Sequence, residues 1–153
     1  MKAISLWRPW DLFVLMGWKT IETRTHERFK GLVGTTIAIH SAKKIDPHWR
    51  AATAAYLAQQ GAEHAERWIL KGGHVHGIVE VLGHDPLDRT HSHRAMIECA
   101  GGERFGLFLD HARLLENPIQ VRGRQGIFNV TISEAAVRAA GRRSNYGTLK
   151  KKE

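Results

Sequence analysis

The first 17 residues of the chain constrain its fold most, because two elements that each need a buried face follow one another without a linker. The segment "KAISLW", residues 2–7, is typical of a short buried strand. Pro9 then stands where the first turn of a helix tolerates proline. Trp10, Phe13 and Val14 recur at helical spacing, and Gly17 is placed to end that helix. We therefore expect a strand and a short helix to enter the core together.

The rest of the chain alternates between strand-like and helix-like segments. A helix is predicted from Asp46-Pro47 to Gly61, a shorter one around Trp68, and a polar loop near residues 84–95. β-Branched or alternating stretches predict strands at 19–24, 35–42, 74–83, 104–115, 118–123 and 126–132. Strands with so few helices among them indicate an α+β fold, a small mixed β-barrel with flanking helices, and not a doubly wound sheet.

Composition indicates one compact domain. The chain has 153 residues, of which 42% are hydrophobic, enough for one well-buried core and too few for two. No apolar run reaches the roughly 18 residues of a membrane span, and no signal peptide is evident, so we expect a cytoplasmic protein without membrane contact. A single cysteine, Cys99, excludes an internal disulfide and agrees with a reducing compartment.

Positive charge is concentrated at the two ends of the chain. The formal net charge is +8, but residues 1–44 carry +5, residues 45–137 carry −2 and residues 138–153 carry +5. We expect a folded domain over residues 1–133, followed by a basic, flexible tail over residues 134–153 that touches phosphates without selecting among them. The N-terminal excess differs from the tail, because it is interleaved with tryptophans and with predicted strands that hold charges in place.

The segment "GWKTIETR", residues 17–24, places three charges beside this first helix. Lys19 follows the turn at Gly17, while Glu22 and Arg24 stand two apart on a predicted strand and so project to one face. Glu22 is suited to fix Arg24 or to accept a hydrogen bond from a base, and Lys19 is suited to attract phosphate. Taken alone, the same pattern also describes an ordinary surface salt bridge.

Three segments resemble the activating-signal-cointegrator homology (ASCH) domain. The stretch "ISLWRPWDLFVLMGWKTIETRT" is similar to the family's strand, Pro-Trp helix and G-x-K-x-x-E-x-R element, here Gly17, Lys19, Glu22 and Arg24. The stretches "GTTIAIHSAKK" and "LLENPIQVRGRQGIF" are similar to its central and closing strands. The resemblance implies a PUA-like β-barrel with a cleft beside the helices, in which family members are thought to bind RNA or another nucleic acid.

On this reading, the partner is RNA, another nucleic acid or a nucleoside, held in the cleft. Lysines and arginines neutralise phosphates, and Trp7 or Trp18 stacks on a base, whereas the other tryptophans, Trp10, Trp49 and Trp68, belong to the core. The glycines around Arg124 permit a tight turn beside an anion. The expected binding residues are Trp7, Arg8, Lys19, Thr20, Glu22, Arg24, His40, Lys43, Lys44, Arg122, Arg124 and Gln125.

The alternative is a small hydrolase that uses the same cleft. Some ASCH-type proteins are amidohydrolases of acylated cytidine with a catalytic Lys and Thr, but here Glu22 stands where the nucleophilic Thr would be. Others are ribonucleases, for which Lys19 and Glu22, with His40, offer acid, base and charge stabilisation. The sequence is compatible with both functions, a nucleic-acid-binding module and a hydrolase.

The ten histidines of the chain raise the question of a metal site. The pairs in "HVH" (74–76) and "HSH" (91–93) each place two imidazoles on one side of an extended segment, without the cysteine or carboxylate spacing of a zinc site. We assign no metal and no cofactor, although the first pair, with Glu80 on the same predicted strand, leaves a divalent ion as the lesser alternative.

Overall fold

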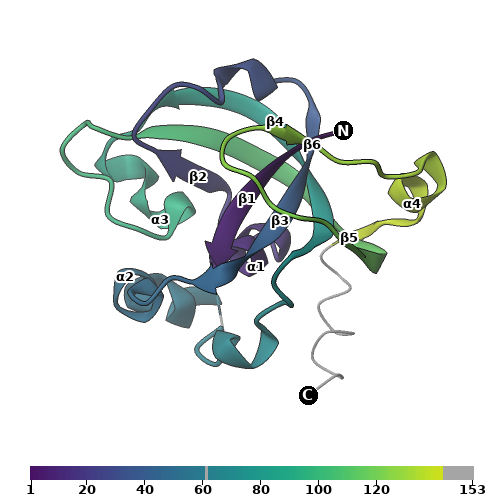
Figure 1. Ribbon diagram of the computed structural model, residues 1–153. Helices are drawn as coiled ribbons and strands as arrows, with labels where there is room; N and C mark the ends of the chain where they lie inside the picture. The colour runs from purple at the N-terminus through teal and green to yellow at the C-terminus, as the bar shows by residue number, and fades with distance from the viewer. Residues whose placement is uncertain (61, 143–153) are drawn as a thin grey trace.

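A computed structural model describes residues 1–60 and 62–142, which form one curved sheet with helices at its ends and inside its curve (Figure 1). The sheet has the strand order β2-β5-β4-β3-β1-β6, with β7 paired to β5. The strands are β1 (Lys2–Arg8), β2 (Ile21–Arg24), β3 (Thr36–Ile45), β4 (His74–Pro86), β5 (Phe105–Gln120), β6 (Phe128–Asn129) and β7 (Gly141–Arg142).

The helices are short. The α-helices are α1 (Trp10–Leu15), α2 (Trp49–Leu57), α3 (Ser92–Ala95) and α4 (Glu134–Ala139), and the 3-10 turns are η1 (Lys30–Leu32), η2 (Ala58–Gln60), η3 (Ala65–Trp68) and η4 (Arg89–His91). Within residues 1–60 and 62–142, no helix has the length and apolar character that crossing a membrane requires.

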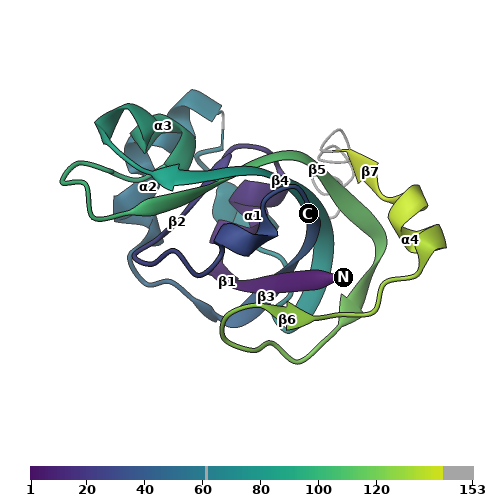
Figure 2. The same ribbon diagram turned by 90° about the horizontal axis from the view of Figure 1, so that it is seen from above.

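The expected α+β class is confirmed, while the term barrel fits only loosely. Strands β1 and β3 pair in parallel, and the other neighbours in the sheet are antiparallel. In the described part of the chain, no pairing joins the two end strands β2 and β6, so the sheet stays open. Three register shifts between β4 and β5 bend these long strands, as bulges do, and Figure 2 shows them curving around α1.

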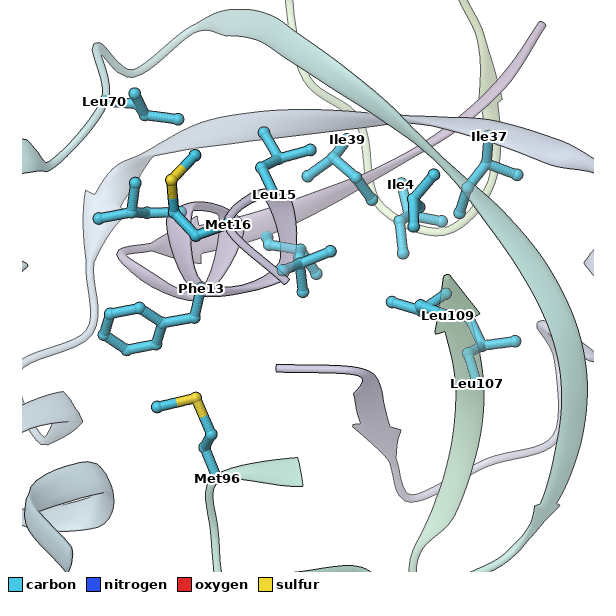
Figure 3. Close-up of a cluster of buried hydrophobic side chains, with 14 of the residues drawn as sticks. Ile4, Phe13, Leu15, Met16, Ile37, Ile39, Leu70, Met96, Leu107 and Leu109 are labelled. Carbon is cyan, nitrogen blue, oxygen red and sulfur yellow. The ribbon is translucent and has the colours of Figure 1, made fainter. Parts of the chain in front are cut away.

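The main core forms where α1 packs into this curve. Phe13 and Leu15 of α1 and Met16, which follows the helix, are buried in one cluster with Ile4 of β1 and Ile39 of β3, as Figure 3 shows. Gly77 of β4 allows the close approach, because a Cβ atom there would lie 2.6 Å from Leu15 Cδ2. The predicted strand and helix at the N-terminus are thus confirmed, and Gly17 ends α1 with a positive φ of 77°.

The middle of the chain differs from the prediction in two places. The segments predicted as separate strands at 104–115 and 118–123 are joined in the single strand β5. Proline is tolerated within this strand because Pro118 lies where the register against β4 shifts, and its missing N–H is not needed for a hydrogen bond between the strands there. The predicted polar loop at 84–95 instead continues β4 to Pro86 and then forms η4 and α3.

The folded domain extends past the predicted boundary at residue 133. Ser133 caps α4 by accepting a hydrogen bond from the backbone N–H of Ala136, and β7 pairs with Arg113 and Leu114 of β5. Ala140 belongs to a second apolar cluster that includes Phe128 of β6, and Val137 packs against that cluster. Residues 134–142 therefore belong to the fold and are not the start of a flexible tail; the remainder of that predicted tail, 143–153, lies outside the described residues.

A buried carboxyl group ties α1 to β3. Asp11 is fully buried, and the Ser41 hydroxyl donates a hydrogen bond to its Oδ2 atom over 2.5 Å. Burial raises the pKa of Asp11 to about 6, although the bond from Ser41 acts in the opposite direction. The folded protein consequently holds a proton on Asp11 at pH values where the unfolded chain has released it.

This proton predicts a specific dependence of stability on pH. The pKa of Asp11 is about 6 in the folded protein and 3.8 in an unfolded chain. Asp11 should therefore make the free energy of unfolding fall as pH rises between these two values, by about 3 kcal/mol in total. Asp11→Asn keeps an acceptor for Ser41 but cannot titrate. Denaturant unfolding of both proteins from pH 4 to 7 measures the difference; parallel pH profiles would contradict the assignment.

Candidate functional site

Two adjoining clefts open beside β1. The larger has a volume of about 1320 Å³ and lies between β1, β3, the segment that follows β2, residues 71–74 and residues 120–127. The smaller, of about 730 Å³, lies between β1, β2, α2 and the segment that follows α3. Ser5, Trp7 and Arg24 line both clefts, so these three residues mark the junction.

The larger cleft is strongly basic. No aspartate or glutamate occurs among the described residues that line it. Of the described lysines and arginines in its wall, only Arg24 forms an ion pair with a described carboxylate, that of Glu22. An array of unpaired cations repels itself unless an anion or salt screens it. The lysines and arginines of its wall are Arg24, Arg28, Lys43, Lys71, Arg122 and Arg124.

The smaller cleft has mixed charge and an aromatic wall. Trp10 lies in its wall and donates from its indole N–H to Asp46 over 2.9 Å. Glu98 and Arg104 lie in the wall nearest α3, and Ala51 and Ala52 of α2 contribute small side chains. Such a cleft suits a compact group with both flat and polar parts, whereas the larger cleft suits an extended anion.

Trp7 stands at the junction and is the most exposed of the cleft aromatics. It follows Ser5 by two positions on β1, so both side chains project to the same face of the strand. Trp7 is 48% exposed, and the Lys44 ammonium lies 3.8 Å from the centre of its ring. Lys44 thereby covers part of an otherwise open stacking surface.

Lys19 lies in the wall of the smaller cleft, almost entirely buried. Only 1% of the residue is exposed, and its Nζ atom donates to the carbonyl of Ala95 over 2.5 Å. Nζ also lies 3.7 Å from Glu22 Oε1 and 5.0 Å from the centre of the Trp10 ring. Burial lowers the pKa of Lys19, and the neighbouring Glu22 carboxylate partly opposes this. The expected direct contact between Lys19 and phosphate is thus not favoured, because the ammonium is already enclosed.

Glu22 connects the buried lysine to the junction of the clefts. Its Oε2 atom accepts a hydrogen bond from Arg24 Nη1 over 2.8 Å, and its Oε1 atom faces Lys19 and the backbone N–H of Thr23. Both oxygens are therefore engaged within the protein. Of the two roles expected for Glu22, orienting Arg24 fits this geometry better than reading a base.

His40 is held in one orientation beneath the larger cleft. Its Nε2 atom bonds to the Val121 carbonyl over 2.7 Å, and its Nδ1 atom bonds to the Ser5 hydroxyl over 2.9 Å. A Cβ atom at position 123 would lie 2.5 Å from the ring, so Gly123 is needed there for close packing. Burial lowers the pKa of His40, although the bond to Val121 opposes this.

Two of the expected binding residues are directed elsewhere. The Arg8 guanidinium donates to three backbone carbonyls, those of Ala42, Lys43 and Leu70, and lines neither cleft. Thr20 lines neither cleft either, since its hydroxyl accepts from Arg94 Nε over 3.0 Å. Both residues fasten neighbouring segments together and are better described as structural.

All the remaining expected residues except Lys44 line one or both clefts, whereas Lys44 contacts the Trp7 ring and lines neither. The lining also has additions that the sequence did not reveal. Lys43, Arg122, Arg124 and Gln125 line the larger cleft. Trp18 packs against Phe13 and Trp68 and so belongs to the core, whereas Trp10, expected there, also faces the smaller cleft. Ser5 was detectable from its spacing to Trp7; no periodic pattern indicated the other additions, which are Arg28, Lys71, Glu98 and Arg104.

Both histidines of the first pair, His74 and His76, form hydrogen bonds with backbone carbonyls. His74 bonds through Nδ1 to the Gly72 carbonyl over 2.9 Å, and His76 bonds through Nε2 to the Lys71 carbonyl over 2.8 Å. Over residues 1–60 and 62–142, no group of three or more histidine, cysteine or acidic side chains is arranged to hold a metal ion. These bonds give the pair a role in shaping the wall of the larger cleft.

The buried ion pairs predict a large effect of neutralising Glu22. Glu22→Gln leaves the enclosed Lys19 ammonium without its carboxylate, which should lower the free energy of unfolding by about 3 kcal/mol. Glu134→Gln is the matched control, because Glu134 pairs with Arg138 on the surface and its side chain is 96% exposed. Denaturant unfolding of both variants measures the contrast; equal, small effects would show that the Glu22 network contributes little.

Comparison with known proteins identifies solved structures that share this fold. No protein-family model matches the chain, and no curated protein matches its sequence. Among solved structures, an ASCH protein from Zymomonas mobilis aligns over 92% of this chain and 96% of its own, with a TM-score of 0.55 and 14% identity. Two variants of that protein, one with serine replaced by alanine and one with tyrosine replaced by phenylalanine, align over the same share of this chain with TM-scores of 0.55 and 0.51 and 15% identity. The chain thus has the ASCH fold that its sequence motifs predicted.

Proposed function

We propose that this protein binds single-stranded RNA, with the phosphates in the larger cleft and one nucleoside in the smaller. The observation that carries the proposal is the wall of the larger cleft, which presents lysines and arginines without an acidic residue among its described members. A polyanion that neutralises these cations releases its own counterions and relieves their mutual repulsion. The ASCH fold supports the same class of partner.

The junction of the clefts supports a single strand over a duplex. Stacking on Trp7 requires a base whose face is free, which an unpaired nucleotide offers and a base-paired one does not. Arg24 lies beside it, oriented by Glu22, where the phosphate and nucleoside portions of one nucleotide would meet. The smaller cleft then receives the base or its sugar between Trp10 and the wall near α3.

The proposal predicts that the exposed arginines of the larger cleft carry much of the salt dependence of binding. Replacing Arg122 and Arg124 together by alanine should weaken binding of all short RNAs similarly, and should reduce the slope of log affinity against log salt by about 0.7 for each phosphate contact removed. Fluorescence anisotropy with a labelled single-stranded RNA at several salt concentrations measures both quantities.

A matched arginine elsewhere provides the control. Arg138 on α4 is 72% exposed and lines neither cleft, so Arg138→Ala removes one positive charge without touching the proposed site. It should change the salt slope much less than either cleft substitution made alone. If Arg138→Ala and Arg122→Ala had the same effect, binding would follow net charge and the cleft would have no special part in it.

A second candidate, hydrolysis in the smaller cleft, is favoured by one observation. Lys19 is a buried amine with a lowered pKa, 3.7 Å from a carboxylate, and such groups are suited to proton transfer. The Glu22 position still lacks the hydroxyl of the Lys/Thr amidohydrolases, so that mechanism does not transfer to this chain.

Incubation with substrate separates the two candidates. Pure binding predicts that short RNAs and an acylated cytidine remain intact with the wild-type protein. Hydrolysis predicts product that disappears in Lys19→Met while affinity for the substrate is largely retained. Product formed equally by wild type and Lys19→Met would indicate a contaminating enzyme, and would count against catalysis by this site.

A further inference from the structure

The Ser5 hydroxyl at the junction of the clefts can accept a hydrogen bond from a ligand but has no proton left to give. The carbonyl of Val121 has no proton, so the 2.7 Å bond to His40 Nε2 requires the hydrogen to be on Nε2. In the neutral ring, Nδ1 is then an acceptor, and the Ser5 hydroxyl donates to it over 2.9 Å. The lone pairs of Ser5 Oγ remain available toward the clefts.

Several contacts hold this arrangement in place. Ser5 and His40 are directly paired residues of the parallel strands β1 and β3. His40 is 2% exposed, and its ring packs edge-on against Phe128 at 5.8 Å and is covered by Gly123. A flipped ring would put carbon atoms against both partners and lose both bonds. Burial also favours the uncharged ring by lowering the pKa of His40.

The position of Ser5 decides what it would meet in a bound nucleotide. Ser5 lines both the larger, basic cleft and the smaller cleft, and the sugar is the part of a nucleotide that connects phosphate to base. A phosphate oxygen only accepts hydrogen bonds, so it gains nothing from a hydroxyl that has already donated its proton. The ribose 2′-hydroxyl can donate, and a deoxyribose has no group at that position.

We propose that Ser5 selects ribose over deoxyribose by accepting a hydrogen bond from the 2′-hydroxyl, with His40 as the residue that orients it. The inference rests on the proposed binding of RNA and specifies the sugar that the same site takes. Arg24, at the same junction, is placed to hold the adjoining phosphate.

The test compares three oligonucleotides of one sequence in binding to the wild-type protein. RNA offers a donor at the 2′ position, the 2′-fluoro form keeps a sugar shape close to that of RNA but offers none, and DNA offers none. RNA should bind about fivefold more tightly than either of the others for one contacted sugar, the value of one ordinary hydrogen bond. Equal binding of RNA and the 2′-fluoro form would overturn the inference.

Substitutions at Ser5 test its role directly. Ser5→Ala should bring RNA down to the affinity of the 2′-fluoro form while leaving that form and DNA unchanged, and Ser5→Thr, which keeps a hydroxyl, should retain the preference. Ser133→Ala is the control, since that hydroxyl caps α4 and lines neither cleft. Full preference for RNA in Ser5→Ala would overturn the inference.

The same experiment separates this inference from the function on which it rests. Binding of all three oligonucleotides with equal, salt-dependent affinity would support the basic cleft and reject a role for Ser5 in selecting the sugar. Failure of all three to bind the wild-type protein would overturn the proposed function and this inference with it. The wild-type comparison needs no variant, so it stands even if Ser5→Ala does not fold.

Discussion

The enclosed ammonium of Lys19 is the constraint on which the arrangement of the site depends. A lysine with 1% exposure is costly unless its charge is balanced, and here the Glu22 carboxylate and the Ala95 carbonyl provide the balance. These contacts join the turn after α1 to β2 and to the end of α3. Because Glu22 also binds Arg24, the same buried group that stabilises the interior fixes a cation that lines both clefts.

Charge is divided between the two clefts in a way that separates their chemistry. The larger has cations without carboxylates among its described lining residues, whereas the smaller contains Glu22, Asp46 and Glu98 beside its own cations. The larger cleft favours the phosphates of a nucleic acid whatever its base sequence. The smaller cleft can distinguish hydrogen-bond donors from acceptors on a ligand. The Ser5–His40 pair lies between them, and its fixed hydrogen-bond direction gives the junction a polarity that a freely rotating hydroxyl would lack.

The sequence predicted those elements whose limits are set by local chemistry. Pro9 and Gly17 bound α1, and β-branched runs identify β3 and β4. Prediction from sequence failed where contacts with distant segments determine the structure. Pro118 suggested a break between two strands, yet the shifted register against β4 accommodates it within β5. In the site, Arg8 looked available for phosphate because no local pattern shows that three backbone carbonyls occupy it. Arg28 and Lys71 reach the cleft from irregular segments, for which spacing gives no direction.

We propose that one continuous surface, from Trp7 and Arg24 to the turn at residues 122–126, receives a single strand. The most direct measurement is a chemical-shift map of the isotope-labelled protein titrated with a short single-stranded RNA at moderate salt. We expect the signals of the Trp7 indole N–H and of the backbone amides of 122–126 to shift together and to saturate at one RNA per protein. Shifts confined to α4 and η4, with both clefts unchanged, would contradict it.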